Sequence, residues 1–327
     1  MITLFHTKSH RLLSSARLPK SGPASLAALI VALLVCVVAS AASAQESFKT
    51  AEEAVDALMN AAKSGDTKGI QRALGPDGAA IASSGDEVED AAARKRFTDA
   101  YEAKHQINME GDHKAVLVIG EQDWPFPIPI VRKDDKWRFD SAAGRDELLD
   151  RRIGRNELAT IQACLAYVDA QNDYAAMMRA STGTASYAGR IVSRPGKKDG
   201  LYWPTAEGES PSPLGELVAS ATTEGYHVDS GRAPFHGYYF KILTRQGSAA
   251  PGGAYDYIVH DKMIGGFALV AYPAAYRNSG VMTFLVNHEG TVFEKDLGPH
   301  TADIVERMSS FDPDDSWKKV TVESPDK

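Results

Sequence analysis

The chain has 327 residues, of which 43% are hydrophobic and 24% are charged, and it contains two cysteines. This composition is ordinary for a globular protein, so it excludes a collagen, a coiled coil, a wholly disordered chain and a polytopic membrane protein. At roughly 100–200 residues per domain, the length predicts two domains. The formal net charge of -7 argues against a nucleic-acid-binding protein, because phosphate contacts require clustered Lys and Arg.

Residues 1–44 have the pattern of a secretory signal peptide. Basic residues without any acidic residue precede a fully apolar run over 26–39, and small residues follow it. This pattern predicts cleavage between Ala44 and Gln45. A membrane-spanning helix needs about 18 or more apolar residues, so we expect export to the periplasm or the extracellular space. The alternative is that residues 26–44 stay uncleaved and anchor the protein in the inner membrane.

Cleavage would change the charge and the thiol content. The leader contains four of the 36 basic residues and none of the 43 acidic ones, so the mature chain would carry a formal net charge of −11. Cys36 lies in the leader, and Cys164 then remains as a single cysteine without a disulfide partner. Cys164 lies on an apolar helix face with no neighbouring histidine, so we expect a buried packing residue and not a reactive thiol.

Residues 45–143 predict an α+β module. Thr50 and Glu53 form a capping-box pattern at the start of a first helix, and Asp66 is placed to cap a second helix. After the helices, strands are expected over 114–120, 127–131 and 136–140. Helices followed by a short antiparallel sheet place the chain in the α+β class.

Residues 144–317 predict a second module, in which a long helix packs on an antiparallel β-meander. The helix is expected over 146–174, either continuous or broken near Gly154. Its expected core-facing residues are Leu158, Ile161, Leu165 and Val168. Near its start, arginines alternate with acidic residues at helical spacing, which favours a salt-bridged, solvated face over an anion site. These arginines are Arg145, Arg151, Arg152 and Arg155.

The remainder of the second module predicts loops and then strands. Residues 190–235 are rich in Pro and Gly, so we expect long loops there. Strands are expected over 237–244, 254–259, 266–273, 281–287 and 291–297. The sequence Asn-His-Glu-Gly at 287–290 predicts a hairpin turn. Residues 318–327 are expected to form a disordered tail.

The candidate binding residues are aromatic and polar side chains near glycine pairs of the second module. They are Tyr202, Trp203, His236, Asp256 and Tyr257. Glycines allow close backbone approach, and Tyr and Trp offer flat amphipathic faces, as in sugar or peptide sites. The alternative interpretation is ordinary sheet packing with tight turns. A hydrolase site would require His236 and Asp256 to lie within hydrogen-bond reach of each other.

The histidines form no His-Glu-x-x-His or Cys-x-x-Cys set, and there is no Gly-x-Ser-x-Gly elbow. We therefore expect no metal and no cofactor, and we favour a protein that is not an enzyme.

The second module resembles the head of a type IV pilin or pseudopilin. The strings that carry the resemblance are NELATIQACLAYVDAQNDY, HGYYFKIL, FALVAYP and GVMTFLVNHEGTVFEKDLG. The resemblance implies a helix packed on an antiparallel meander. Another module separates this region from the apolar segment, and no prepilin cleavage motif is present, so the resemblance supports the fold and not filament formation.

A more specific resemblance extends over roughly 120–317. The strings WPFPIPIVRKDDKWRFDSAAGRDELLDRRIGRNELATIQACLAYVDAQ, HGYYFKILTRQG, PGGAYDYIV and MIGGFALVAYP resemble an exported bacterial family catalogued as domain of unknown function 2950. The resemblance implies an exported protein without an established activity, and it carries over no catalytic residue.

These observations predict an exported, non-enzymatic binding or scaffolding protein of the bacterial periplasm or envelope. Its expected partner is an envelope protein or a glycan and not a nucleic acid, and it would contact the membrane only if the leader is uncleaved. The alternatives are a hydrolase acting on envelope material and an accessory component of a pilus or secretion system.

Overall fold

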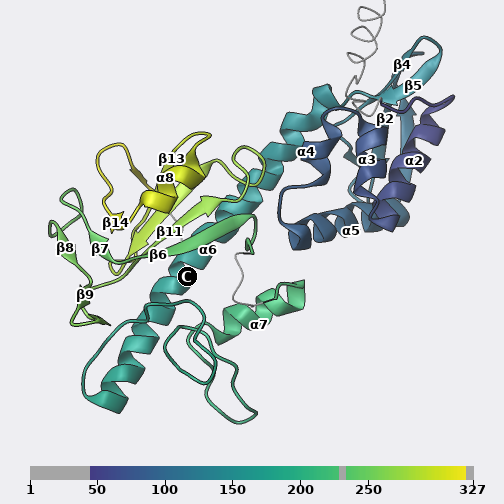
Figure 1. Cartoon of the computed structure of the whole chain (residues 1–327). Helices are drawn as coiled ribbons and strands as arrows, with labels where there is room; N and C mark the ends of the chain where they lie inside the picture. Colours follow the sequence, from purple (N-terminus) through teal and green to yellow (C-terminus); the bar gives the residue numbers. More distant parts are fainter. Residues whose placement is uncertain (1–44, 228–232, 322–327) are drawn as a thin grey trace, which may run out of the picture. The chain divides into compact units, whose positions relative to one another are not determined.

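The computed structural model describes residues 45–227 and 233–321 (Figure 1). They belong to one compact unit and combine helices with antiparallel sheets, which confirms the α+β class. The predicted signal peptide, residues 1–44, lies outside the described residues. Within the described ranges, no helix has the length and apolar character needed to cross a membrane.

The first two helices of the described part begin at the capping residues that the sequence predicts. Thr50 Oγ1 accepts a hydrogen bond from the Glu53 backbone N–H at 3.1 Å, and the Glu53 carboxylate accepts one from Lys49 N–H at 2.9 Å. Asp66 caps the next helix by accepting from Gly69 N–H at 2.9 Å. The helices in the described part are α2 (Ala51–Ser64), α3 (Thr67–Leu74), α4 (Gly78–Ala82), α5 (Glu87–Ala103), α6 (Ser141–Thr182), α7 (Gly215–Glu224) and α8 (Thr301–Arg307).

The first sheet packs against α2 and α3 and shares a hydrophobic core with them. Its strands are β1 (His105–Met109), β2 (Lys114–Ile119), β3 (Trp124–Pro125), β4 (Ile130–Lys133) and β5 (Lys136–Phe139). They are antiparallel in the order β1-β2-β4-β5, with β3 paired to β2. Strand β1 was not predicted from the sequence, because only Ile107 of its side chains is even half-buried and no apolar alternation marks it.

Helix α6 is continuous over 42 residues, so of the two alternatives that the sequence left open, the break near Gly154 does not occur. A Cβ at Gly154 would meet no atom within 4 Å, so this glycine is not required by packing. At Gly144 the opposite holds, because a Cβ would lie 2.2 Å from the Pro127 carbonyl oxygen. Gly144 therefore lets α6 approach the backbone of the first module. The helix ends at Gly183, which adopts φ = 77°.

The second sheet is the predicted meander. It consists of β6 (Tyr238–Leu243), β11 (Ala268–Pro273), β12 (Met282–Asn287), β13 (Val292–Asp296) and β15 (Lys318–Lys319). The strands are antiparallel in the order β15-β13-β12-β11-β6, and α6 packs on them. Figure 1 shows this sheet along the later half of α6, with α2–α5 near its first half. The predicted hairpin turn is confirmed by a hydrogen bond from Gly290 N–H to the Asn287 carbonyl oxygen.

Three sequence expectations for this region are wrong. The predicted strand 254–259 is not part of the meander but splits into β8 (Tyr255–Asp256) and β9 (Ile258–Val259), since its outer residues are exposed while Tyr257 turns into the core. Small side sheets hold these pieces, with β7 (Arg245–Gln246), β10 (Lys262–Met263) and β14 (Ser310–Phe311). The expected loop region contains α7. At the start of the expected tail, Lys318–Lys319 form β15, while residues 322–327 lie outside the described residues.

The buried face of α6 also differs from the predicted stripe at one position. Ile161 and Val168 are each 8% exposed, as expected, but Leu158 is 67% exposed. At the level of Leu158 the buried positions are the polar residues Asn156 and Thr160 instead. Apolar spacing alone does not reveal that this turn of the helix faces a polar junction.

The Asp86 carboxylate joins the start of α5 to the second module. It is 2% exposed and accepts hydrogen bonds from Glu89 N–H at 3.1 Å, Tyr226 O–H at 2.9 Å and Gly237 N–H at 2.8 Å. The first bond caps α5, and the other two come from residues about 140–150 positions away in the chain. One side chain therefore serves both a helix terminus and the contact between the two cores.

Arg152 and Asn278 form a second part of this junction. The Arg152 guanidinium donates to the backbone carbonyls of Ala80 and Ile81 and to the Asn278 side-chain oxygen. Asn278 in turn donates from Nδ2 to the Ser83 carbonyl oxygen at 2.8 Å. Arg152 was predicted to lie on a solvated, salt-bridged face, and this is wrong. Arg145 and Arg151 do pair with acidic side chains as predicted. For Arg155 the prediction is also wrong, because its side chain forms no ion pair with a described residue.

Candidate functional site

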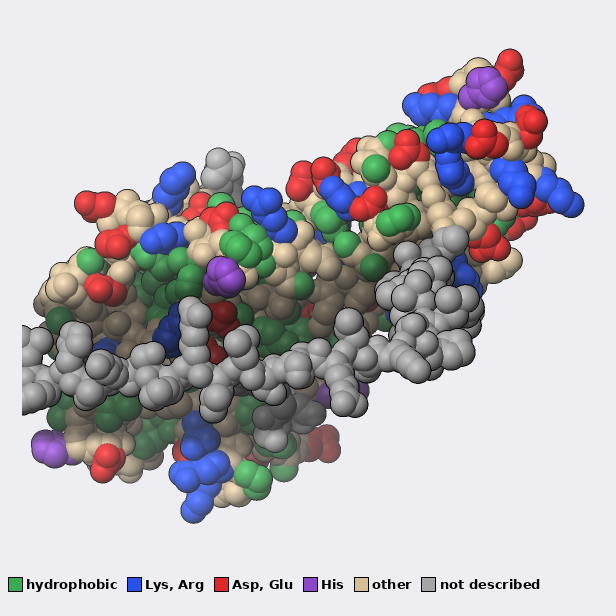
Figure 2. Space-filling model, turned by 45° about the horizontal axis from the view of Figure 1, so that its top comes forward, with side chains coloured by type: hydrophobic (Ala, Val, Ile, Leu, Met, Phe, Trp, Pro, Cys, Tyr) green, Lys and Arg blue, Asp and Glu red, His purple; other side chains and the backbone are tan. Residues whose placement is uncertain are grey.

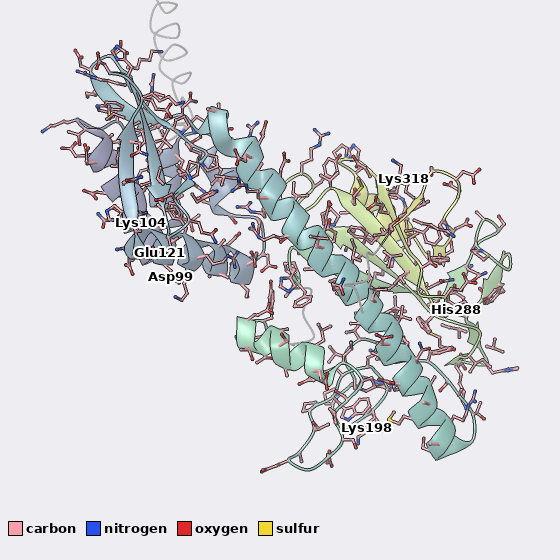
Figure 3. All side chains as sticks on the ribbon, turned by 180° about the vertical axis from the view of Figure 1, so that it is seen from behind. Asp99, Lys104, Glu121, Lys198, His288 and Lys318 are labelled. Atoms are coloured by element: carbon pink, nitrogen blue, oxygen red, sulfur yellow. The ribbon has the colours of Figure 1, made fainter. Side chains whose placement is uncertain are left out.

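Three of the predicted binding residues belong to the core of the second module. Tyr257 is fully buried and donates its hydroxyl hydrogen to Gln246 Oε1 at 3.0 Å. Trp203 is 7% exposed, and its indole Nε1 has no hydrogen-bond partner among the described residues. Lys198 lies beside the later half of α6, with Nζ 5.4 Å from the centroid of the Trp203 ring (Figure 3). Tyr202 packs half-buried against the same core.

His236 and Asp256 each have a separate partner. His236 Nε2 lies 3.3 Å from the Glu224 carboxylate, at the end of α7. Asp256 is exposed on β8 and lies 3.4 Å from Arg245 Nε. Among the described residues no hydrogen bond or ion pair joins His236 to Asp256, so the structure does not bring together the pair that a hydrolase site requires.

A cavity of about 630 Å³ lies between helices α6 and α7 and strands β6 and β11. We call it the aromatic groove. Six aromatic side chains line it: Tyr167, Tyr226, Phe235, Tyr239, Phe240 and Tyr272. The apolar lining is completed by residues of α6, α7 and β11, by Leu214 and by the segments 191–192 and 233–234. His236 does not line the groove, but its ring contacts those of Tyr226 and Phe235, so one of the predicted residues supports the wall.

Helix α7 supplies one wall of the aromatic groove. Leu214, Leu217, Val218 and Ala221 line it, at spacings of three, one and three residues. This is the spacing of one helical face, and Ser220 and the threonines after Ala221 occupy the exposed side. The helix forms because its apolar face is buried against the module, although prolines and glycines dominate the surrounding sequence. The 3-1-3 spacing is the signal that identifies this wall in the sequence.

Two of the tyrosine rings that line the groove are fixed by hydrogen bonds of their own hydroxyl groups. Tyr226 donates to Asp86 and accepts a hydrogen bond from His236 N–H at 3.1 Å. Burial raises the pKa of Tyr226, and the neighbouring Asp86 carboxylate raises it further, so the hydroxyl stays protonated. The Tyr167 hydroxyl accepts from Gln171 Nε2 at 2.9 Å, and burial raises its pKa also. Both rings are thus held in place before any ligand arrives.

Polar and charged side chains lie at the groove's margin, and Lys241 among them is held by hydrogen bonds. Lys241 Nζ donates to the carbonyls of Val305, Glu306 and Met308, each at 2.8 Å, at the end of α8. His227 and Glu306 are exposed where they border the groove. The arrangement is suited to burying a mostly apolar body against aromatic faces, with polar groups only at the rim.

The described part of the chain contains no group of three or more His, Cys, Asp or Glu side chains that is placed to hold a metal ion. Cys164 is buried on α6, as predicted, and burial raises its pKa to about 12. Acidic and basic side chains are interspersed over the face shown in Figure 2.

The fold and the groove define an α+β protein with a largely apolar cavity beside an antiparallel meander. The chain belongs to the family described as "Protein of unknown function (DUF2950)", whose model matches residues 45–320. No curated protein and no solved structure matches the chain. The resemblance to a pilin head therefore stays a prediction.

Proposed function

We propose that this family member is an exported binding protein that holds a small, largely apolar molecule in the aromatic groove. The observation that carries the proposal is the groove itself. Its volume of about 630 Å³ lies within the range of roughly 300–1,000 Å³ that is typical of ligand sites. Aromatic rings supply large apolar area at little cost in side-chain entropy, and here two of them are already fixed by hydrogen bonds.

The lining favours a hydrocarbon or aromatic ligand over a glycan. A glycan exposes many hydroxyls, and each one that is buried without a partner lowers affinity. Most of the groove's wall is apolar, and Lys241 already donates to three carbonyls. Export rests on the leader pattern of residues 1–44, which also argues for a ligand met in the periplasm or envelope.

The test is binding of the uncharged fluorophore N-phenyl-1-naphthylamine to the chain from Gln45 onward. We expect a saturable rise in fluorescence, because the probe is quenched in water. Val218→Trp fills the groove from α7 and should weaken binding by tenfold or more. Ser220→Trp places the same side chain on the exposed side of α7 and serves as the matched control.

Two results would overturn the assignment of the groove. One is the absence of saturable binding to the unaltered chain. The other is equal affinity in Val218→Trp and Ser220→Trp when circular dichroism shows both variants folded. Export is tested separately, by fractionating cells and measuring the N-terminal residue by mass spectrometry. Mature protein that begins at Gln45 in the periplasm or medium is the expected result.

A further inference from the structure

A second cavity, of about 320 Å³, lies between α5 and the first half of α6. Its floor is apolar and consists largely of buried residues of the first core, among them Leu58, Ile70, Leu74, Ile119 and Phe126. Five arginines also line it: Arg94 and Arg96 from α5, and Arg151, Arg152 and Arg155 from α6. We call this cavity the arginine pocket.

Helical spacing brings the arginines together. Arg151, Arg152 and Arg155 follow Leu148 by three, four and seven residues, so all four side chains share one face of α6. On α5, Arg94 lies three residues before Phe97 and also faces the pocket. Basic groups from two helices therefore surround one apolar floor.

Two of the five guanidinium groups are paired with carboxylates. Arg96 Nη2 lies 2.6 Å from Glu89 Oε1, and Arg151 Nη2 lies 2.6 Å from Glu147 Oε1. Arg151 also lies over the Trp124 ring, 5.3 Å from its centroid. The Glu89 carboxylate also acts on Arg152 and Arg155, and its charge opposes the lowering of their pKa values, so it offsets part of the positive charge in the pocket.

The other three arginines are not neutralised by an ion pair. Arg152 donates to backbone carbonyls and to an amide oxygen at the junction described above. Asp90 also lines the pocket, but its two oxygens accept hydrogen bonds from Ser84 N–H at 2.9 and 3.0 Å. The Arg94 and Arg155 side chains form no hydrogen bond or ion pair with any described residue.

Partial burial makes this cluster of cations electrostatically unfavourable. Burial lowers the pKa of Arg152, and burial together with the Arg96 cation lowers the pKa of Arg155. Arginine nevertheless keeps its charge at neutral pH. An anion beside Arg155 would relieve this repulsion and could accept two parallel hydrogen bonds from its guanidinium group.

We propose that the arginine pocket binds a single-chain anionic amphiphile, with its carboxylate between Arg94 and Arg155 and its hydrocarbon chain on the apolar floor. The volume is near the lower end of the range for ligand sites, roughly 300–1,000 Å³, which favours one chain over a two-chain lipid. The pocket shares no lining residue with the aromatic groove, so this proposal does not rest on the proposed function.

The test is calorimetric titration of the chain from Gln45 onward with decanoate, and with uncharged 1-decanol as the neutral comparison. We expect one decanoate per chain, and decanol bound at least tenfold more weakly. Arg94→Gln and Arg155→Gln should each weaken decanoate binding by about tenfold, the value of one hydrogen bond to a charged group. Neither side chain has a structural partner among the described residues, so both variants should fold.

Two controls separate the pocket from general charge and from the groove. Arg179→Gln removes the same charge from the last turn of α6, outside the pocket, and should keep decanoate affinity. Val218→Trp, in the aromatic groove, should keep it too. Equal affinity for decanoate and decanol, or unchanged decanoate binding in an Arg94→Gln/Arg155→Gln double variant, would overturn the proposal.

A membrane is the other source of an anionic headgroup. Sedimentation with phosphatidylglycerol vesicles tests it. Arginine-dependent binding to these vesicles, without binding of monomeric decanoate, would identify a membrane-contacting face and would also overturn the proposal.

Discussion

Several single residues have roles that their neighbours in the sequence predict. The Thr50 cap depends only on residues within one turn, so the local pattern suffices to identify it. Cys164 was likewise predicted as a buried packing residue, because apolar residues flank it on a helical face. The sequence did not show whether Trp203 and Tyr257 are buried in the core or line a binding site, because an aromatic residue in a strand-rich region is typical of either place.

The first prediction concerns the reactivity of Cys164. Burial raises the pKa of this thiol to about 12, so the reactive thiolate is scarce at pH 8 and the sulfur is also inaccessible. In the chain from Gln45 onward, Ellman's reagent should label the native protein far more slowly than the urea-unfolded protein. Ser248→Cys adds an exposed thiol and should give one fast equivalent. Rapid labelling of both thiols would show that Cys164 is accessible.

At the scale of elements, the pattern of apolar residues in the sequence identified most strands but not every helix. β6, β11, β12 and β13 were predicted within a few residues, because each is an apolar run bounded by turn residues. Helix α7 was missed since its short apolar face lies within a segment rich in Pro and Gly. The continuity of α6 through Gly154 was left open, because a glycine in a helix costs only about 1 kcal/mol and packing decides the outcome.

The second prediction is that two glycines of α6 respond oppositely to alanine. Gly154→Ala should raise the free energy of unfolding by about 0.5–1 kcal/mol, since the added methyl group meets open space and alanine favours the helix. Gly144→Ala should lower it, because its Cβ would lie 2.2 Å from the Pro127 carbonyl oxygen. Urea denaturation of the two variants measures both. A loss of stability in Gly154→Ala would contradict the continuous helix.

At the scale of the molecule, polar groups join the two cores. Asp86 accepts hydrogen bonds from Tyr226 and Gly237, and both bonds are buried. All of these groups are shielded from water, so each bond that is lost leaves an unsatisfied partner. The sequence predicts two modules but not this junction, because its members are separated by more than a hundred residues.

The third prediction tests the junction. Asp86→Ala removes a helix cap and two bonds from the second module, so it should cost about 3 kcal/mol of unfolding free energy. Thr50→Ala is the matched control, because it removes a cap alone and should cost about 1 kcal/mol. Equal losses in the two variants, measured by urea denaturation, would show that Asp86 acts only as a cap.

The sequence by itself determined the α+β class, the helix caps, the buried cysteine and most strands of the meander. Each of these depends on propensity, capping or periodicity, which act over a few neighbouring residues. Only the tertiary structure decided that Tyr167, Val218 and Tyr239 share one groove, and that Arg94 and Arg155 face one pocket. Those groups belong to different elements, and the free energy of packing whole helices against sheets places them together.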